Sequence, residues 1–251
     1  MEREQAPSGA KVKMIRKVAG ICLALLSVSA RPDDSYVDGV GGSVKPMRGH
    51  KTIRMVSERV DMWLPKGEVR AQFVFKNEGP ATVVEMGFPE CGTYPIRGGK
   101  RTAFRYFRSL VDGKLFTVKR MVQRGDDAWG YQHWWVKKVP FAKGQTRKVV
   151  CEYAANPDDM GRGWYAFDYR LDTGGSWKGN IGEAVIVAHF ADPKAQTIET
   201  VSPDPAGKSG DKIVWRCMNF KPEAYGDWWL IDVTWRTAVE PTESKASATV
   251  R

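Results

Sequence analysis

Residues 171–182 read Leu-Asp-Thr-Gly-Gly-Ser-Trp-Lys-Gly-Asn-Ile-Gly, and the prediction of the fold starts from this stretch. Four glycines within nine residues indicate a backbone that needs positive φ or a close approach at several points. The one large side chain, Trp177, is predicted to fold back and cover the turn. We therefore predict a tight connection between two strands, with these structural residues: Thr173, Gly174, Gly175, Trp177, Gly179 and Ile181.

The segments on both sides of this turn have the patterns of strands. Residues 165–172 alternate between apolar and polar, and residues 184–190 are nearly all apolar, as in a central sandwich strand. The same alternation occurs in residues 69–76, and Asp112-Gly113 between two apolar runs predicts a hairpin. After residue 30, no segment keeps a helical period for ten residues. We predict an all-β fold of one or two antiparallel, Ig-like β-sandwich units.

The first residues have the pattern of a signal peptide. Residues 11–17 contain four basic residues (Lys11, Lys13, Arg16 and Lys17), residues 19–28 form an apolar region, and the small residues Ser29 and Ala30 follow it. This apolar run is shorter than the roughly 20 residues of a transmembrane helix. We therefore predict cleavage after Ala30, export to the periplasm or the extracellular space, and no transmembrane span after processing. Either Met1 or Met14 can be the start.

The remaining chain divides at a turn-rich segment around Asn156-Pro157-Asp158-Asp159. The predicted organisation is a signal peptide (1–30), an extended leader (31–50), an N-terminal β-sandwich unit (51–155), a C-terminal β unit (156–237) and a polar, disordered tail (238–251). Whether the two β units fold independently stays open.

The charge is positive but dispersed. Residues 1–30 hold five Lys/Arg and two Asp/Glu, so the rest keeps 34 of 39 basic and 27 of 29 acidic residues, a net charge of +7. This net positive charge suits a protein that functions beside anionic polymers. The basic residues, however, form no run of the kind found in nucleic-acid-binding arms. Envelope glycan or another envelope protein is the predicted partner, and nucleic acid is not.

Three cysteines follow the predicted cleavage point: Cys91, Cys151 and Cys217. The number is odd, so one disulfide with one free thiol is one arrangement, and the pairing stays open. Cys151 and Cys217 each share a strand face with apolar residues, which favours buried hydrophobic roles. No two cysteines have CxxC spacing, which disfavours zinc and thioredoxin-like chemistry, and no cofactor is predicted.

Several motifs together resemble a family of secreted bacterial proteins called domain of unknown function 4424. The resemblance includes Asp34 before Gly41-Gly42, residues 58–64 leading into 69–77, and Phe88-Pro89. Its most specific part is residues 173–181, Thr-Gly-Gly-Ser-Trp-Lys-Gly-Asn-Ile, which are similar to a TGxxWxGxI signature. The chain departs from the family at Glu90-Cys91, where a second proline is expected. The resemblance implies an exported, β-rich protein and assigns no catalytic residue.

Motifs of known enzymes do not fit the sequence. The glycines of residues 174–179 have Walker A spacing, but Asn180 and Ile181 replace the lysine and the Ser/Thr, and a strand follows instead of a helix. His50, His133 and His189 lack metal-ligand spacing, and no serine lies in a GxSxG motif. We predict a non-catalytic protein without a metal site. An envelope hydrolase with dispersed carboxylates is an alternative, because paired acids can converge from distant strands.

Tryptophan is abundant, with ten residues. Adjacent strand residues point to opposite faces, so Trp134-Trp135 and Trp228-Trp229 can each place one indole outward, and Trp63 alternates onto the face of Arg59. Burial in the sandwich core is the more common role for indoles. The predicted function is an exported, non-catalytic β-sandwich protein of the cell envelope with a binding or structural role. The alternative is a carbohydrate-binding module that uses three exposed tryptophans: Trp63, Trp134 and Trp228.

Overall fold

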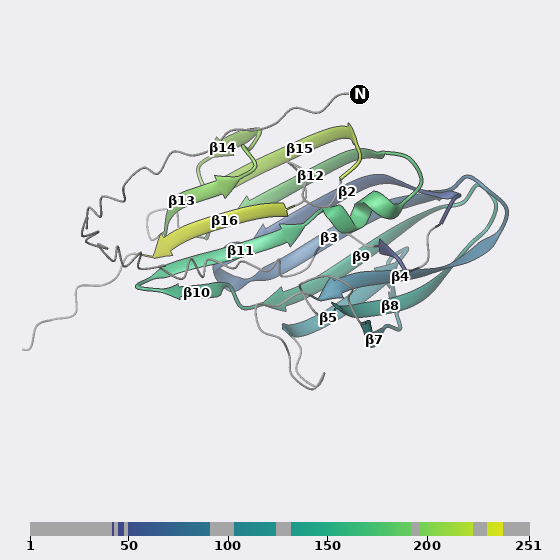
Figure 1. The fold of residues 1–251 in the computed structure, drawn as a ribbon, viewed down its shortest axis with the longest axis horizontal. Coiled ribbons are helices and arrows are strands. Elements are labelled where there is room, and N and C mark those ends of the chain that lie inside the picture. The colour runs from purple at the N-terminus through teal and green to yellow at the C-terminus, as the bar shows by residue number, and fades with distance from the viewer. Residues whose placement is uncertain are drawn as a thin grey trace, which may run out of the picture. The chain divides into compact units, whose positions relative to one another are not determined.

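The structure is a computed structural model, and it describes residues 42, 45–47, 50–90, 103–123, 132–191, 196–222 and 230–237. In this part of the chain nearly all regular structure is β, and the two helical segments are 3-10 turns of three and five residues, η1 (Leu64–Lys66) and η2 (Asp172–Ser176). The prediction of an all-β fold is confirmed (Figure 1). Among the described residues, no helix has the length and apolar character needed to cross a membrane.

The largest sheet has eight strands and is called the large sheet here. Its spatial order is β14 (Gly207–Ser209), β15 (Lys212–Phe220), β12 (Ile181–His189), β2 (Ile53–Trp63), β3 (Glu68–Asn77), β9 (Thr146–Ala155), β5 (Phe104–Val111) and β6 (Lys114–Phe116).

Two four-stranded sheets complete the described fold. The β8 sheet has the order β1 (Lys45–Pro46), β4 (Thr82–Glu90), β8 (Gln132–Phe141) and β7 (Lys119–Gln123). The β11 sheet has the order β10 (Asp158–Gly161), β11 (Trp164–Arg170), β16 (Leu230–Thr237) and β13 (Gln196–Ser202).

The two small sheets cover one face of the large sheet. Phe88 of the β8 sheet packs on Tyr153 of β9 with ring centroids 5.2 Å apart. On the other half of that face, the Tyr169 hydroxyl of β11 donates a hydrogen bond of 2.9 Å to Glu58 of β2. Burial, followed by the nearby Glu58 charge, raises the pKa of Tyr169 well above its usual value, so this hydroxyl stays a donor. A layered sandwich with a shared inner face follows.

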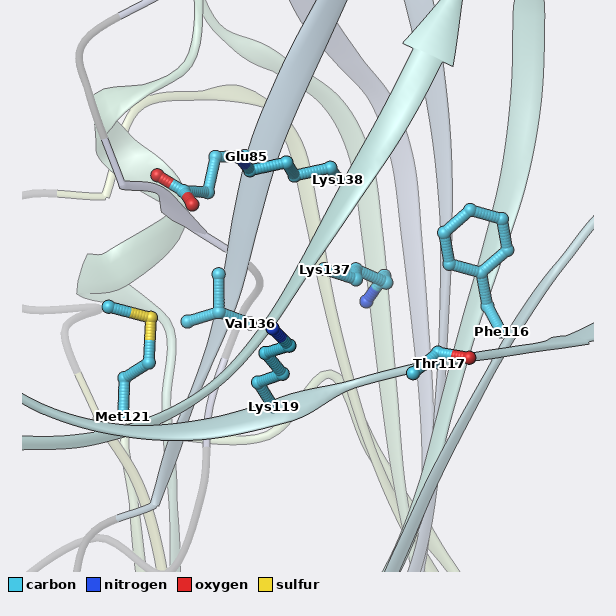
Figure 2. A pocket seen from close by; sticks show the side chains of 8 residues that line it. All are labelled: Glu85, Phe116, Thr117, Lys119, Met121, Val136, Lys137 and Lys138. Carbon is cyan, nitrogen blue, oxygen red and sulfur yellow. The ribbon is translucent and has the colours of Figure 1, made fainter.

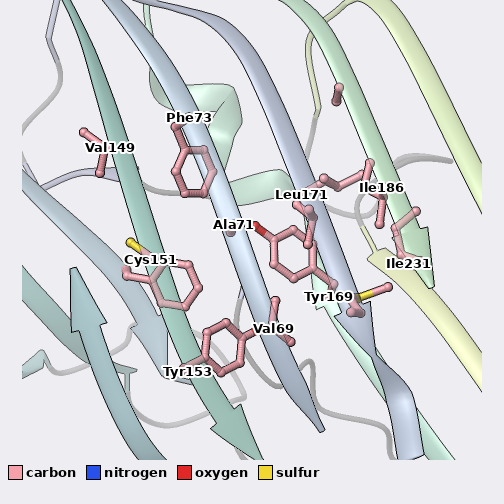
Figure 3. Packing of buried hydrophobic residues seen from close by; sticks show 14 of the residues in the cluster. Val69, Ala71, Phe73, Val149, Cys151, Tyr153, Tyr169, Leu171, Ile186 and Ile231 are labelled. Atoms are coloured by element: carbon pink, nitrogen blue, oxygen red, sulfur yellow. The ribbon is translucent and has the colours of Figure 1, made fainter. Parts of the chain in front are cut away.

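The alternation of the strands explains why this face is buried. Residues 69, 71, 73 and 75 of β3 and residues 149, 151, 153 and 155 of β9 are all buried, and the residues between them are mostly more exposed. Figure 3 shows side chains of β3 and β9 beside Tyr169 and Ile231 from the β11 sheet and beside Leu171, which follows β11. One continuous core therefore joins residues from both predicted β units.

One strand pair departs from the predicted antiparallel arrangement. β12 lies parallel to β2, with Glu183 opposite Ser57 and His189 opposite Trp63. All the other pairs of named strands are antiparallel. β2 and β12 come from opposite sides of the predicted boundary at residue 156, so the two segments share the large sheet. The described residues all belong to one compact unit, residues 36–251.

The glycine-rich stretch connects two strands that lie in different layers. β11 belongs to the β11 sheet and β12 to the large sheet, so residues 171–180 carry the chain from one layer to the other and do not close a hairpin. Residues 172–176 form η2. Trp177 is buried, with an exposed fraction of 3%, and its ring lies 4.6 Å from that of Phe75 in β3.

The glycines of residues 174–182 are required for different structural reasons. Gly179 has a φ of +64°, the one positive value among the glycines at 174, 175, 179 and 182. A Cβ on Gly175 would lie 2.0 Å from the Pro222 carbonyl oxygen, and one on Gly182 would lie 2.5 Å from the Val56 oxygen. Close approach of a neighbouring backbone oxygen therefore explains two of these glycines, and backbone conformation explains a third.

The hairpin at Asp112-Gly113 is confirmed. Both residues have positive φ, 50° and 81°, and they join β5 to β6 with Val111 opposite Lys114. Positive φ at both central residues of a two-residue loop is the requirement that Asp-Gly meets.

Candidate functional site

An exposed aromatic cluster lies on the face of the large sheet that is turned away from the small sheets. Arg59, Asp61 and Trp63 alternate along β2 on this face, and His189 is the β12 residue in register with Trp63. We call these four residues the Trp63 platform. Trp63 is 39% exposed, so the predicted exposure of this indole is confirmed.

Contacts within the Trp63 platform fix the orientation of the indole. The rings of Trp63 and His189 are stacked, with centroids 5.2 Å apart and planes inclined by 12°. The Nε2 of His189 lies 3.0 Å from Oδ1 of Asp61. Arg59 donates two hydrogen bonds of 3.0 Å to the same carboxylate. One face of the Trp63 indole is stacked on the His189 imidazole, which Asp61 binds in turn. The orientation of the indole is therefore fixed before a ligand binds.

The strand register places a second exposed aromatic residue in line with Trp63. Trp63 is opposite Glu68, Glu68 is opposite Ala154, and Ala154 is opposite Tyr106, which is 46% exposed. Neighbouring strands lie about 4.8 Å apart, so the two aromatic residues are separated by about 14 Å. Ala154 between them is small and buried. The row therefore has an exposed aromatic residue at each end, with Glu68 and Ala154 between them.

A charged row runs beside the aromatic row. Asp61 is opposite Arg70, Arg70 is opposite Glu152, and Glu152 is opposite Arg108. Arg70 binds Glu152 at 2.9 Å, and Arg108 also donates to that carboxylate. Acidic and basic groups thus alternate across four strands. Such groups offer paired donors and acceptors next to apolar ring faces, the combination that recognises polyhydroxylated ligands.

Trp134 corrects one prediction. Its exposed fraction is 1%, so it cannot be a ligand platform without a rearrangement. The segment around β1 covers it: Lys45 lies over the ring at 5.1 Å, and a Cβ on Gly87 would lie 3.0 Å from the indole. The alternation rule gave the right face of the strand, but the Lys45 side chain of β1, which pairs with β4, lies over that face. Trp228 lies outside the described residues.

A buried polar cluster was missed by the sequence analysis. Arg120 of β7 donates to both carboxylate oxygens of Glu90, at 2.9 and 3.2 Å, and also lies 2.8 Å from Nδ1 of His133. A guanidinium only donates, so Nδ1 of His133 accepts and carries no proton. Burial, and then the Arg120 charge, lower the pKa of His133. In the sequence, these three residues have in common only that each lies near the end of a predicted strand, beside a turn-rich segment. This pattern is too weak to predict that they form a cluster.

A pocket of about 320 Å³ lies beside β7 and β8 (Figure 2). Three lysines line it, together with one carboxylate and several apolar side chains. No sequence prediction pointed to this place, because its walls come from strands whose pairing was unknown.

The described residues contain no group of three or more His, Cys, Asp or Glu side chains placed to hold a metal ion. Cys151 and Cys217 are buried free thiols. Cys91 lies outside the described part of the chain, so its pairing stays open.

Comparisons with known proteins show a likeness in fold. No family model matches the chain, and no curated protein matches it. A solved structure of a "putative nutrient binding protein" from Legionella pneumophila is 20% identical, covers 80% of this chain and 72% of its own, and has a TM-score of 0.60. An M1 zinc metallopeptidase from Deinococcus radiodurans is 9% identical, covers 75% of this chain and 43% of its own, and has a TM-score of 0.38. At these identities, the first likeness concerns the fold alone.

Proposed function

We propose that this chain is an exported, non-catalytic binding protein of the cell envelope, and that envelope glycan binds on the Trp63 platform. The observation that carries the proposal is the exposed indole of Trp63, stacked on His189 and flanked by a row of alternating charges. Export is supported by the basic and apolar segments before Ala30. Membership in the domain of unknown function 4424 family is part of the same proposal and is supported by residues 173–181.

Each side chain has a distinct task in this proposal. The open face of Trp63 covers the apolar face of a sugar ring, and Tyr106 about 14 Å away holds a later ring of the same oligosaccharide. Arg70 and Arg108 donate to hydroxyl or carboxylate oxygens, and Glu152 keeps both arginines in position. His189 and Asp61 hold the indole.

The fold neighbour from Legionella pneumophila, described as a nutrient binding protein, is compatible with a binding role for this chain. The alternative of an envelope hydrolase needs two acidic side chains that face each other across a pocket. Among the described residues that line the pocket beside β7 and β8, Glu85 is the one carboxylate. No observation therefore favours the hydrolase.

The test measures the binding of glycans to the protein that begins at residue 31. Binding is monitored by calorimetry and by the protection of tryptophan fluorescence from a neutral quencher. Soluble peptidoglycan fragments and neutral oligosaccharides serve as ligands. Trp63→Ala is expected to weaken binding by at least about tenfold, as the loss of an aromatic hot spot does.

Trp164→Ala is the matched control. Trp164 is half-buried, lies in the β11 sheet and packs under Arg236 at 5.7 Å, so it resembles Trp63 without belonging to its surface. The control is expected to bind as the unmodified protein does. Lack of binding to every glycan, or equal losses in both variants, would overturn the proposal.

A further inference from the structure

A second ligand site is indicated by the pocket beside β7 and β8. The pocket lies at the edge of the β8 sheet, where the link from β6 to β7 passes from the large sheet to the β8 sheet. Its volume of about 320 Å³ is at the lower end of the range for small-molecule sites. It is separate from the Trp63 platform, since none of its lining residues belongs to that surface.

The buried side chain of Lys137 is the unusual feature of this pocket. Lys137 is 2% exposed, and its Nζ donates to the Cys151 sulfur at 3.8 Å. A thiol is a weak acceptor, and an ammonium has three protons to donate. Within the described part of the chain, no carboxylate forms an ion pair with Lys137.

The surroundings of Cys151 leave it unable to neutralise the lysine. The Ser109 hydroxyl donates to the Val150 carbonyl at 3.1 Å and lies 3.8 Å from the Cys151 sulfur. Burial raises the pKa of the Cys151 thiol, although the Lys137 charge opposes this rise. The thiol therefore stays neutral near pH 7. A buried cation without an anionic partner is costly, and an anionic ligand would remove that cost.

The rest of the lining defines the ligand further. Lys119 and Lys138 add two exposed cations, and Glu85 adds one carboxylate, so the lining carries a net positive charge. Phe116, Met121 and Val136 supply apolar walls. In Figure 2, Lys137 lies between Phe116 and Val136, with Lys119 and Met121 below.

We propose that this pocket binds a small organic carboxylate with an apolar body, and that the Lys137 ammonium pairs with its carboxylate. One buried ammonium matches one negative charge. A free phosphate or sulfate would leave the apolar walls without a partner, and it would lack the guanidinium fork or backbone nest that such anions prefer. A ligand with a carboxylate group and an aliphatic or aromatic body would pair with the Lys137 ammonium and would also cover the apolar walls.

The experiment compares octanoate with octan-1-ol, which has the same chain without the charge, by calorimetry on the unmodified protein. Octanoate is expected to bind, and the alcohol at least about tenfold more weakly, because a charge-assisted hydrogen bond is lost. Lys137→Met keeps the length and apolar character of the side chain and is expected to weaken octanoate binding by about tenfold to 100-fold.

Lys138→Met is the matched control, since it removes an exposed cation from the same lining. It is expected to change the affinity by less than about threefold, as surface charges do. Lys137→Met is also expected to melt at the same or a higher temperature than the unmodified protein without ligand, because an unpaired buried charge is gone.

Four results would overturn the proposal: no binding of octanoate at millimolar concentration, equal binding of octan-1-ol, full octanoate affinity in Lys137→Met, or a marked fall in the melting temperature of that variant. Glycan binding at Trp63 should be unchanged in Lys137→Met. The two proposals therefore succeed or fail separately.

Discussion

The indole of Trp63 lies face to face with the imidazole of His189, and the two rings come from the parallel strands β2 and β12. The stack joins the end of one strand to the end of another that follows far later in the chain. Because Asp61 binds the same imidazole, three side chains hold one exposed indole. A surface tryptophan fixed in this way loses less freedom on binding than a mobile one.

The stack should be measurable as a coupling energy. His189→Ala is expected to lower the free energy of unfolding by about 1 kcal/mol, the scale of an aromatic pair with one charged hydrogen bond. A double-mutant cycle with Trp63→Ala in urea should give a coupling of about 0.5–1 kcal/mol. Purely additive effects would mean that the two rings do not support each other.

Trp177 should be essential for stability. Trp177→Ala empties a buried site against Phe75 and is expected to cost about 3–5 kcal/mol, measured by urea denaturation. Trp177→Phe keeps a ring at this place and should cost clearly less. If Trp177→Ala melts like the unmodified protein, the indole is not a packing residue.

Three glycines should respond differently to alanine. Gly175→Ala directs a Cβ at the Pro222 oxygen and is expected to cost about 2–3 kcal/mol. Gly179→Ala meets open space but keeps a φ of +64°, which costs about 1–2 kcal/mol. Gly207→Ala has open space and no positive φ, so it should be neutral or slightly stabilising. A different order in thermal unfolding would contradict the backbone geometry.

His133 should make stability depend on pH. Its pKa in the folded protein is below the ordinary 6.5, because of burial and then Arg120, so the unfolded chain takes up the proton first as the pH falls. Stability is therefore expected to decline below pH 6.5 and to level off below the folded pKa. His133→Gln keeps an acceptor for Arg120 and should flatten this part of the curve. Parallel curves for both proteins would disprove the assignment.

The two buried thiols should be unreactive in the folded state. Burial raises the pKa of Cys217 to about 11 and also raises that of Cys151. Alkylation at pH 8 in a Cys91→Ser background should be slow under native conditions and fast in denaturant, because the thiolate is the reactive form. Rapid native labelling at either position would show that the site opens.

Local patterns in the sequence predicted most strand segments and one turn. The alternation of residues 69–76 gave the inward face of β3, and Asp112-Gly113 gave a hairpin with two positive φ values. Both predictions depend only on residues that are close together in the sequence. Trp177 was predicted to cover its own turn, whereas its contact with Phe75 of β3 depends on long-range packing.

Long-range packing could not be predicted in the same way. Trp134 has the alternation of an outward residue, but Lys45 from the leader region lies over it. The pocket around Lys137 and the Glu90–Arg120–His133 cluster both depend on which strand lies beside which. Trp63 was predicted correctly because its own strand decides its face, whereas its stacking on His189 required the parallel pairing of β2 with β12.

This parallel pairing also bears on biosynthesis. β3 follows β2 after a short turn, but the other edge of β2 is completed only by residues 181–189. Until those residues pair with it, β2 has a row of unpaired amides and carbonyls, which is a template for association with other chains. A nascent chain arrested or cleaved before residue 181 should therefore aggregate, and a chaperone that binds extended segments would have its greatest effect in that interval.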